Sequence, residues 1–153
     1  MTPEEKLASL GLTLPSAPVP VANYVPFRWA GDLLYLSGQG PKRADGTYKQ
    51  GRLGRDMTVE EGYAEARLTA LNLLAVAKQA VGELSRIEAV VKLLGMVNAE
   101  PDFADQPKVI NGCSDLLVEV LGDAGRHARS AVGMGSLPNR MAVEVEAILL
   151  VRR

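Results

Sequence analysis

The sequence predicts an α+β protein in which two helices cover a single face of one β-sheet. Three observations lead to this fold class. Short β-prone runs occur in the first and last parts of the chain, stretches with apolar residues at helical spacing lie between them, and turn residues separate the segments. The chain has 153 residues, which is enough for one domain with a buried core. The expected order is therefore β-β-loop-α-β-α-β-β in two layers.

The N-terminal part of the chain predicts a short helix followed by a hairpin. Residues 3–10 can form a short helical turn, with a proline near its start. The three prolines within residues 11–20 predict an extended connector. Residues 24–28 and 33–37 are β-prone runs on either side of an Ala-Gly-Asp turn, so we expect them to pair.

The most clearly marked helix follows a polar, glycine-rich segment at residues 42–58, which we expect to form a loop or a weak hairpin. Thr58 can cap the exposed amides of the first helical turn, and Glu61 can complete a capping box. Apolar residues then recur at helical spacing until Gly82, a residue type common at helix ends. The pattern predicts one long helix from about residue 58 to residue 81.

The second half of the chain predicts a strand, a helix and two further strands. The aliphatic run at 87–97 is typical of a buried strand, and residues 108–121 show helical spacing up to Gly122. Residues 128–137 and 141–151 are β-prone runs on either side of a Leu-Pro-Asn break. Such a break favours a hairpin or another tight connection between the last two strands.

The last predicted strand places two carboxylates on one face. Glu144 and Glu146 alternate with valines and alanine, and strand side chains alternate faces with a period of two. A carboxylate among apolar residues needs water, a partner charge or a ligand, and Arg129 is the obvious candidate partner. From the residues alone, a purely structural ion pair is the more common role for such an arginine. The aliphatic strands also predict that the sheet face without helices packs against other copies of the chain.

Composition and charge exclude several classes of partner. The formal net charge is -1, with two Phe and one Trp, so the chain offers neither a basic field nor an aromatic platform for nucleic acid. The start of the chain does not resemble a signal peptide, and no run reaches the roughly 18 apolar residues of a membrane span. Cys113 is the only cysteine, so we expect a cytoplasmic protein without an intrachain disulfide. Cys113 reads as a small buried residue and His127 as a solvated connector, too few for a zinc cluster.

Four short stretches share a pattern with a known family. They are Asn23-Tyr24-Val25; Leu36-Ser37-Gly38-Gln39 with Pro41; Asn111; and Arg129-Ser130-x-Val132 followed by Leu137-Pro138 and Val143-Glu144-Val145-Glu146-Ala147. In this order and spacing they resemble the reactive intermediate deaminase family, also called YjgF-like or L-PSP proteins. The resemblance covers about residues 21–152, so we expect an N-terminal extension at 1–20 and a single domain at 21–153. It implies a chorismate-mutase-like two-layer sandwich with a mixed sheet, assembled as a homotrimer with clefts between subunits.

The resemblance also implies an activity and a site. Family members hydrolyse enamine or imine intermediates, such as 2-aminoacrylate, to 2-keto acids and ammonia, with no cofactor and no metal. By resemblance, Arg129 binds the substrate carboxylate and Glu144 orients the attacking water. The other residues that the resemblance places along the cleft are Tyr24, Ser37, Gly38, Asn111 and Ala131.

Ala131 departs from the family pattern, because many members have a cysteine two residues after the arginine. This departure motivates a second hypothesis, a trimer that binds a small carboxylate or 2-keto acid and acts through a partner without turnover. Ribonuclease activity, attached to the family by name, is a third hypothesis, and the near-neutral charge argues against it. The expected partners are thus a small carboxylate and further copies of the chain, with no membrane and no nucleic acid.

Overall fold

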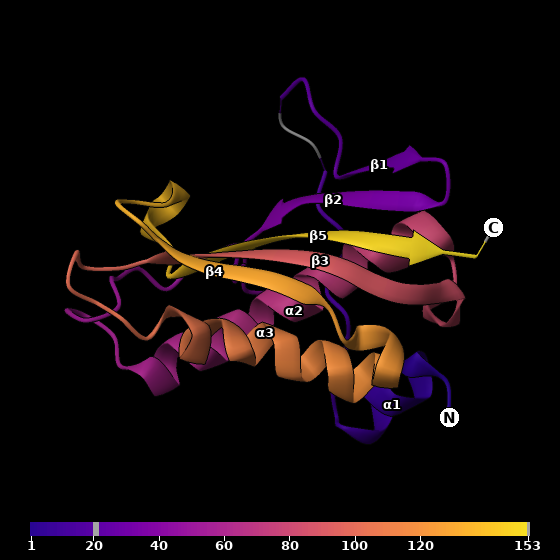
Figure 1. The fold of residues 1–153 in the computed structure, drawn as a ribbon, viewed down its shortest axis with the longest axis horizontal. Coiled ribbons are helices and arrows are strands. Elements are labelled where there is room, and N and C mark those ends of the chain that lie inside the picture. Colours follow the sequence, from indigo (N-terminus) through magenta and orange to yellow (C-terminus); the bar gives the residue numbers. More distant parts are fainter. Residues whose placement is uncertain (20–21, 153) are drawn as a thin grey trace.

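The chain forms one five-stranded sheet with three α-helices, as the computed structural model shows for the residues it describes, 1–19 and 22–152. The strands are β1 (Phe27–Ala30), β2 (Leu33–Gln39), β3 (Ile87–Asn98), β4 (Ala128–Met134) and β5 (Val143–Val151). The helices are α1 (Pro3–Ser9), α2 (Val59–Val81) and α3 (Gln106–Leu121). All three helices lie on one side of the sheet (Figure 1), which confirms the α+β class and the single covered face.

The strand order is β1-β2-β5-β3-β4, and the sheet is mixed because β4 runs parallel to β3. The predicted β1–β2 hairpin is confirmed, with Phe27 opposite Leu36. The interpretation of the last two strands as a hairpin is wrong, since β3 lies between β4 and β5. The chain instead crosses from β3 through α3 to β4, and a parallel pair needs such a long connection. The short 3₁₀ turn Pro138–Arg140 then carries the chain past β3 to β5.

The helix boundaries follow local capping chemistry. Thr58 caps α2 through a hydrogen bond that its Oγ1 accepts from the Glu61 amide at 3.1 Å, and Glu61 completes the predicted capping box. The helix ends at Gly82, whose φ of 82° is accessible mainly to glycine. Helix α3 begins two residues earlier than the sequence pattern predicted, because Pro107 is well tolerated in a first helical turn.

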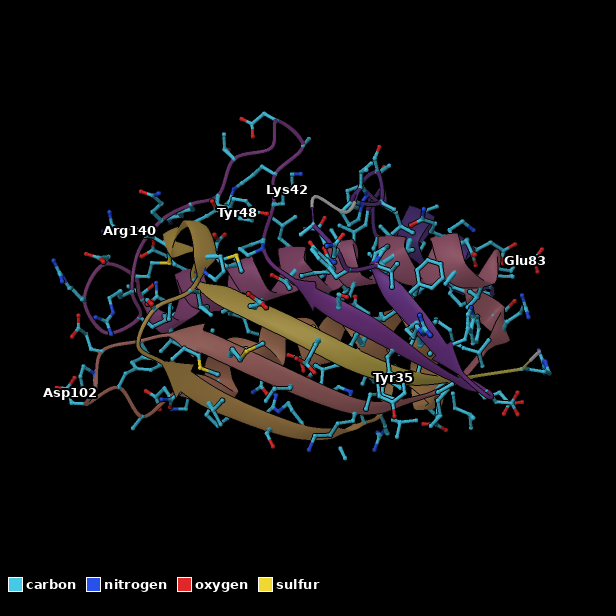
Figure 2. All side chains as sticks on the ribbon, turned by 90° about the horizontal axis from the view of Figure 1, so that it is seen from above. Tyr35, Lys42, Tyr48, Glu83, Asp102 and Arg140 are labelled. Atoms are coloured by element: carbon cyan, nitrogen blue, oxygen red, sulfur yellow. The ribbon has the colours of Figure 1, made fainter. Side chains whose placement is uncertain are left out.

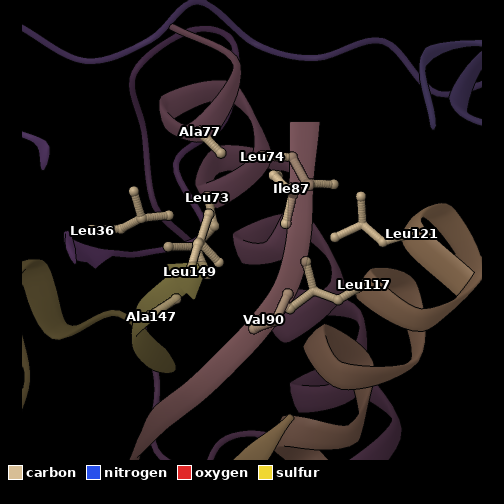
Figure 3. Close-up of a pocket in the computed structure, with 10 residues that line it drawn as sticks. All are labelled: Leu36, Leu73, Leu74, Ala77, Ile87, Val90, Leu117, Leu121, Ala147 and Leu149. Carbon is tan, nitrogen blue, oxygen red and sulfur yellow. The ribbon is translucent and has the colours of Figure 1, made fainter. Parts of the chain in front are cut away.

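The core lies between the sheet and helices α2 and α3. Alternate residues of β5 are buried on the helix side, from Val143 to Val151, as the period-two pattern predicted. Figure 3 shows part of this core, where leucines of α2 and α3 meet the inner faces of β2, β3 and β5. The labelled residues are Leu36, Leu73, Leu74, Ala77, Ile87, Val90, Leu117, Leu121, Ala147 and Leu149.

The other face of the sheet carries exposed apolar side chains. Tyr35 is 44% exposed and lies opposite Ile148, which shares the outer face of β5. Val132 is 39% exposed and is level with Met96 on the neighbouring strand. Packing of this face against further copies of the chain stays a prediction, supported by the presence of these side chains.

Close packing of α2 against α3 makes a first prediction testable. A Cβ at Gly112 would overlap the Tyr63 carbonyl oxygen of the facing helix. Replacing Gly112 by Ala should therefore destabilise the fold by about 1–3 kcal/mol, although alanine favours helices by about 1 kcal/mol. Urea unfolding measures this loss. The exposed Lys108→Ala on the same helix should stay within about 0.5 kcal/mol of wild type, and a Gly112→Ala protein as stable as wild type would contradict the packing argument.

Candidate functional site

A cleft of about 430 Å³ opens where β2 ends beside the start of β5. It gathers four of the residues that the sequence singled out, from segments far apart in the chain. They are Tyr24, Ser37, Gly38 and Glu144. The β2–β5 pairing shifts register between Leu36 and Gln39, so the end of β2 departs from the regular ladder where it borders the cleft.

Glu144 lies half-buried in this cleft on the face of the sheet that carries no helix. Gly38 makes room for it, because a Cβ at Gly38 would overlap the Glu144 carboxylate. Burial raises the pKa of Glu144, and the negative charge of Glu146 raises it further. A carboxyl group with a raised pKa is suited to both accepting and returning a proton.

Ser37 and Tyr24 differ in how firmly they are held. The Ser37 hydroxyl donates to the Val25 carbonyl at 2.6 Å, and the Ser37 amide donates to the Pro26 carbonyl at 2.9 Å. These bonds tie the segment before β1 to β2, as expected for a serine that bonds local backbone. Tyr24 precedes β1 and is 53% exposed, so its ring stands at the open side of the cleft.

Two further cleft residues, Lys42 and Tyr48, were missed by sequence reasoning. Both belong to the loop after β2, and Figure 2 shows them close together, with Tyr35 on the sheet face below. Burial raises the pKa of Tyr48, and the negative charge of Glu144 adds to the effect. A polar, glycine-rich loop gives no periodic signal, so the sequence alone could not place either residue.

Buried polar side chains of α2 hold this loop in place. The Asn72 amide donates to the Gly40 carbonyl at 3.0 Å and to the Lys42 carbonyl at 3.2 Å. Arg43 makes two hydrogen bonds to the buried Glu65 carboxylate, at 2.8 and 2.7 Å. The loop therefore forms a fixed wall of the cleft, with Lys42 exposed at its rim.

Arg129 lies outside this cleft, on the opposite side of the sheet from Glu144. Arg129 is level with the buried Leu93 of β3, which pairs with the buried Ala147 of β5, so Arg129 lies on the side of the helices. Glu144 is one of the alternate residues of β5 that face away from the helices. The prediction that Arg129 pairs with the carboxylates of β5 is therefore wrong within one chain. The Nη1 atom of Arg129 instead donates to Asn111 Oδ1 at 2.9 Å, which brings two predicted site residues together.

The remaining predicted residues have structural surroundings. Ala131 is partly buried against the core, two residues along β4 from Arg129. Cys113 is fully buried and burial raises the pKa of its thiol to about 12, so the interpretation of Cys113 as a small apolar residue is confirmed. His127 is half-buried rather than solvated, because it hydrogen-bonds Ser114 and Gly125.

Across residues 1–19 and 22–152, no group of three or more His, Cys, Asp or Glu side chains is arranged to hold a metal ion. In the same part of the chain, no helix is both long and apolar enough to cross a membrane.

The fold and the cleft place the chain in a known class, the YjgF/chorismate-mutase-like proteins. Residues 4–146 match the sequence pattern of the family described as "YjgF/chorismate_mutase-like, putative endoribonuclease", and the chain belongs to this family. The match confirms the resemblance that the four short stretches indicated.

Individual relatives agree over nearly their whole length. The chain is 46% identical over 144 residues to Protein TCP17 of Trypanosoma cruzi, covering 94% of this chain and 90% of that protein. The crystal structure of Atu1372 from Agrobacterium tumefaciens, a protein described as having unknown function, is 48% identical with a TM-score of 0.92, covering 98% and 92% of the two chains. A protein from Shewanella oneidensis MR-1 that carries the endoribonuclease description is 41% identical with a TM-score of 0.93, covering 99% and 100%.

The raised pKa of Glu144 predicts how its replacement alters stability with pH. The folded protein holds the Glu144 proton more tightly than the unfolded chain, so ionisation of Glu144 destabilises the fold as the pH rises through the raised pKa. Glu144→Gln should therefore be more stable than wild type at neutral pH, and this gain should vanish below the ordinary pKa of 4.5. Thermal unfolding across this pH range tests the prediction.

The matched control for that measurement is Glu83→Gln, at an exposed position beyond the end of α2. This change should alter stability by no more than about 0.5 kcal/mol at any pH. A Glu144→Gln protein that is less stable than wild type at neutral pH would show that the Glu144 carboxylate is favourably bound, contrary to the burial argument.

Proposed function

We propose that the protein hydrolyses enamine and imine intermediates of the 2-aminoacrylate type to 2-keto acids and ammonia. The reaction takes place in clefts shared between neighbouring copies of the chain in a homotrimer. One observation carries the proposal: Glu144 and Arg129, the acid and the cation that this chemistry needs, lie on opposite sides of the sheet. Arg129 and Glu144 of a single chain cannot contact the same small substrate. Arg129, on the edge strand β4 of one copy, can instead face the cleft that contains Glu144 of the next copy.

The proposed chemistry needs few groups. The enamine takes a proton at carbon to become an imine, water adds to the C=N carbon, and the resulting carbinolamine loses ammonia to leave the keto acid. The Arg129 guanidinium binds the substrate carboxylate through two parallel hydrogen bonds. Glu144 accepts a proton from the attacking water and returns it to the departing nitrogen, a role that its raised pKa favours.

A non-catalytic role is the second candidate, and Ala131 is the observation that favours it. Ala131 carries no thiol, and its methyl group packs on the core beside Arg129. A site that keeps Arg129 but lacks a catalytic thiol would bind a small carboxylate or 2-keto acid without hydrolysing an imine. Calorimetry that finds such binding in the absence of imine hydrolysis would favour this candidate.

The endoribonuclease name of the family and of the Shewanella relative suggests a third activity. The net charge is near neutral, and among the described residues that line the cleft Lys42 is the one cation, so RNA phosphates find little to bind. Ribonuclease activity that persists through stringent purification and is lost in Glu144→Gln would overturn the deaminase proposal.

Purified protein should accelerate release of 2-keto acid when a dehydratase generates the enamine in the assay. Arg129→Ala should remove about 2–5 kcal/mol of binding free energy, so kcat/KM should fall roughly 30-fold or more. Arg129→Lys keeps the charge but loses the planar fork, so it should recover only part of the activity. Wild-type protein that does no better than buffer with several enamines would exclude the enzymatic function.

Mixing two inactive variants tests whether the site is shared. In a ring of three chains with each cleft formed by two of them, random mixtures of Arg129→Ala and Glu144→Gln should restore about a quarter of the clefts. We expect coexpressed variants to recover about that share of wild-type activity, while the separate variants stay inactive. If the mixture is as inactive as the separate variants although subunit exchange is proven, the site is not shared between chains in this way.

A further inference from the structure

The guanidinium of Arg129 is held by a chain of hydrogen bonds that the proposed reaction does not use. Its Nη1 donates to Asn111 Oδ1 at 2.9 Å and to Ser114 Oγ at 3.1 Å. Ser114 Oγ in turn lies 2.8 Å from His127 Nε2, and His127 Nδ1 lies 2.6 Å from the Gly125 carbonyl oxygen. Two residues outside the family pattern, Ser114 and His127, thus stand behind Arg129.

The direction of these bonds follows from chemistry. A carbonyl oxygen can only accept, so His127 Nδ1 carries the proton that bonds Gly125. In a neutral imidazole the other nitrogen, Nε2, is then an acceptor, and the Ser114 hydroxyl must donate to it. The lone pairs of Ser114 Oγ are left to accept from Arg129. Neutral His127 therefore fixes the orientation in which Ser114 is a good acceptor for the guanidinium.

Nε and Nη2 of the guanidinium are not used in this arrangement. Within the described residues, 1–19 and 22–152, Arg129 forms hydrogen bonds through Nη1 alone. The Nε–Nη2 edge, which can bind a carboxylate through two parallel bonds, stays available. Two acceptors on one nitrogen restrain the rotation of a long side chain that otherwise samples many rotamers.

A serine next to a histidine can also act as a nucleophile with its base, but the surroundings here favour a supporting role. The Ser114 hydroxyl is already engaged with both Arg129 and His127. Its oxygen already accepts from Arg129, and it lies within helix α3 beside the buried Cys113.

We propose that Ser114 and His127 are positioning residues that orient the Arg129 guanidinium for the substrate carboxylate. The inference rests on the proposed deaminase function for its kinetic test, but its binding test needs no turnover. Because the carboxylate is held equally before and during the reaction, a misplaced guanidinium raises KM and leaves kcat nearly unchanged. Asn111 still holds Nη1 when the Ser114 bond is lost, so KM should rise by about 3- to 10-fold rather than by the full value of a charge-assisted bond.

The experiment compares Ser114→Ala with two replacements of His127. Gln at position 127 can still accept from the Ser114 hydroxyl, whereas Leu cannot. Ser114→Ala and His127→Leu should raise KM, and the dissociation constant for pyruvate measured by calorimetry, by about 3- to 10-fold. His127→Gln should recover most of the affinity. The control Ser85→Ala, at an exposed position before β3, should match wild type.

The outcomes separate this inference from the function itself. If wild type turns over no imine but binds pyruvate, the deaminase proposal fails and the pyruvate affinities of the variants still test the positioning role. Unchanged KM and pyruvate affinity in folded Ser114→Ala, shown by circular dichroism and oligomeric state, would overturn the positioning role. A fall in kcat with unchanged KM would also overturn it and indicate direct participation of Ser114. Should His127→Leu fail to fold, Ser114→Ala alone decides, because alanine is well tolerated in a helix.

Discussion

The alternation of side chains along β5 is the constraint on which both the core and the candidate site depend. Val143, Val145 and Ala147 must face the helices to complete the apolar layer, and Glu144 is consequently turned to the uncovered face. A slip of one residue would bury the carboxylate and expose the valines, so the core itself fixes where the acid stands. The same register places Arg129 on the helix side.

Residues outside the sheet then set the shape of the cleft. Gly38 leaves the space that the Glu144 carboxylate occupies, and Asn72 and Glu65 of α2 hold the loop that carries Lys42 and Tyr48. These helix residues are buried and polar, and each satisfies backbone or charged groups of a loop that has no periodic structure of its own. The loop is therefore held as firmly as the helix that it contacts, and it forms a fixed wall of the cleft beside the Glu144 carboxylate.

The sequence predicted the features governed by local rules. The capping box at Thr58, the stop at Gly82 and the alternation of β5 each follow from neighbours along the chain, and the structure confirms them. Sequence reasoning failed where distant strands decide the outcome. The expected hairpin was wrong because β3 inserts between β4 and β5. The expected pairing of Arg129 was wrong because the register turns Arg129 to the helix side and Glu144 to the other face. The roles of Lys42, Tyr48 and Ser114 depend on tertiary contacts for which a single sequence carries no periodic signal.

The separation of the two charges has a consequence for how the site can be regulated by assembly. An isolated chain keeps Arg129 engaged with Asn111 and Ser114 and keeps Glu144 in a cleft without a cation of comparable geometry. Because the exposed apolar side chains of the sheet lie on the same face as Glu144, burial of that face between copies would lower the dielectric around the carboxylate. Assembly would then act on Glu144 in two opposing ways, because burial raises its pKa and the guanidinium of a neighbour lowers it. Under the proposed function, an unassembled chain would therefore have Glu144 in its cleft without the guanidinium that binds the substrate carboxylate there.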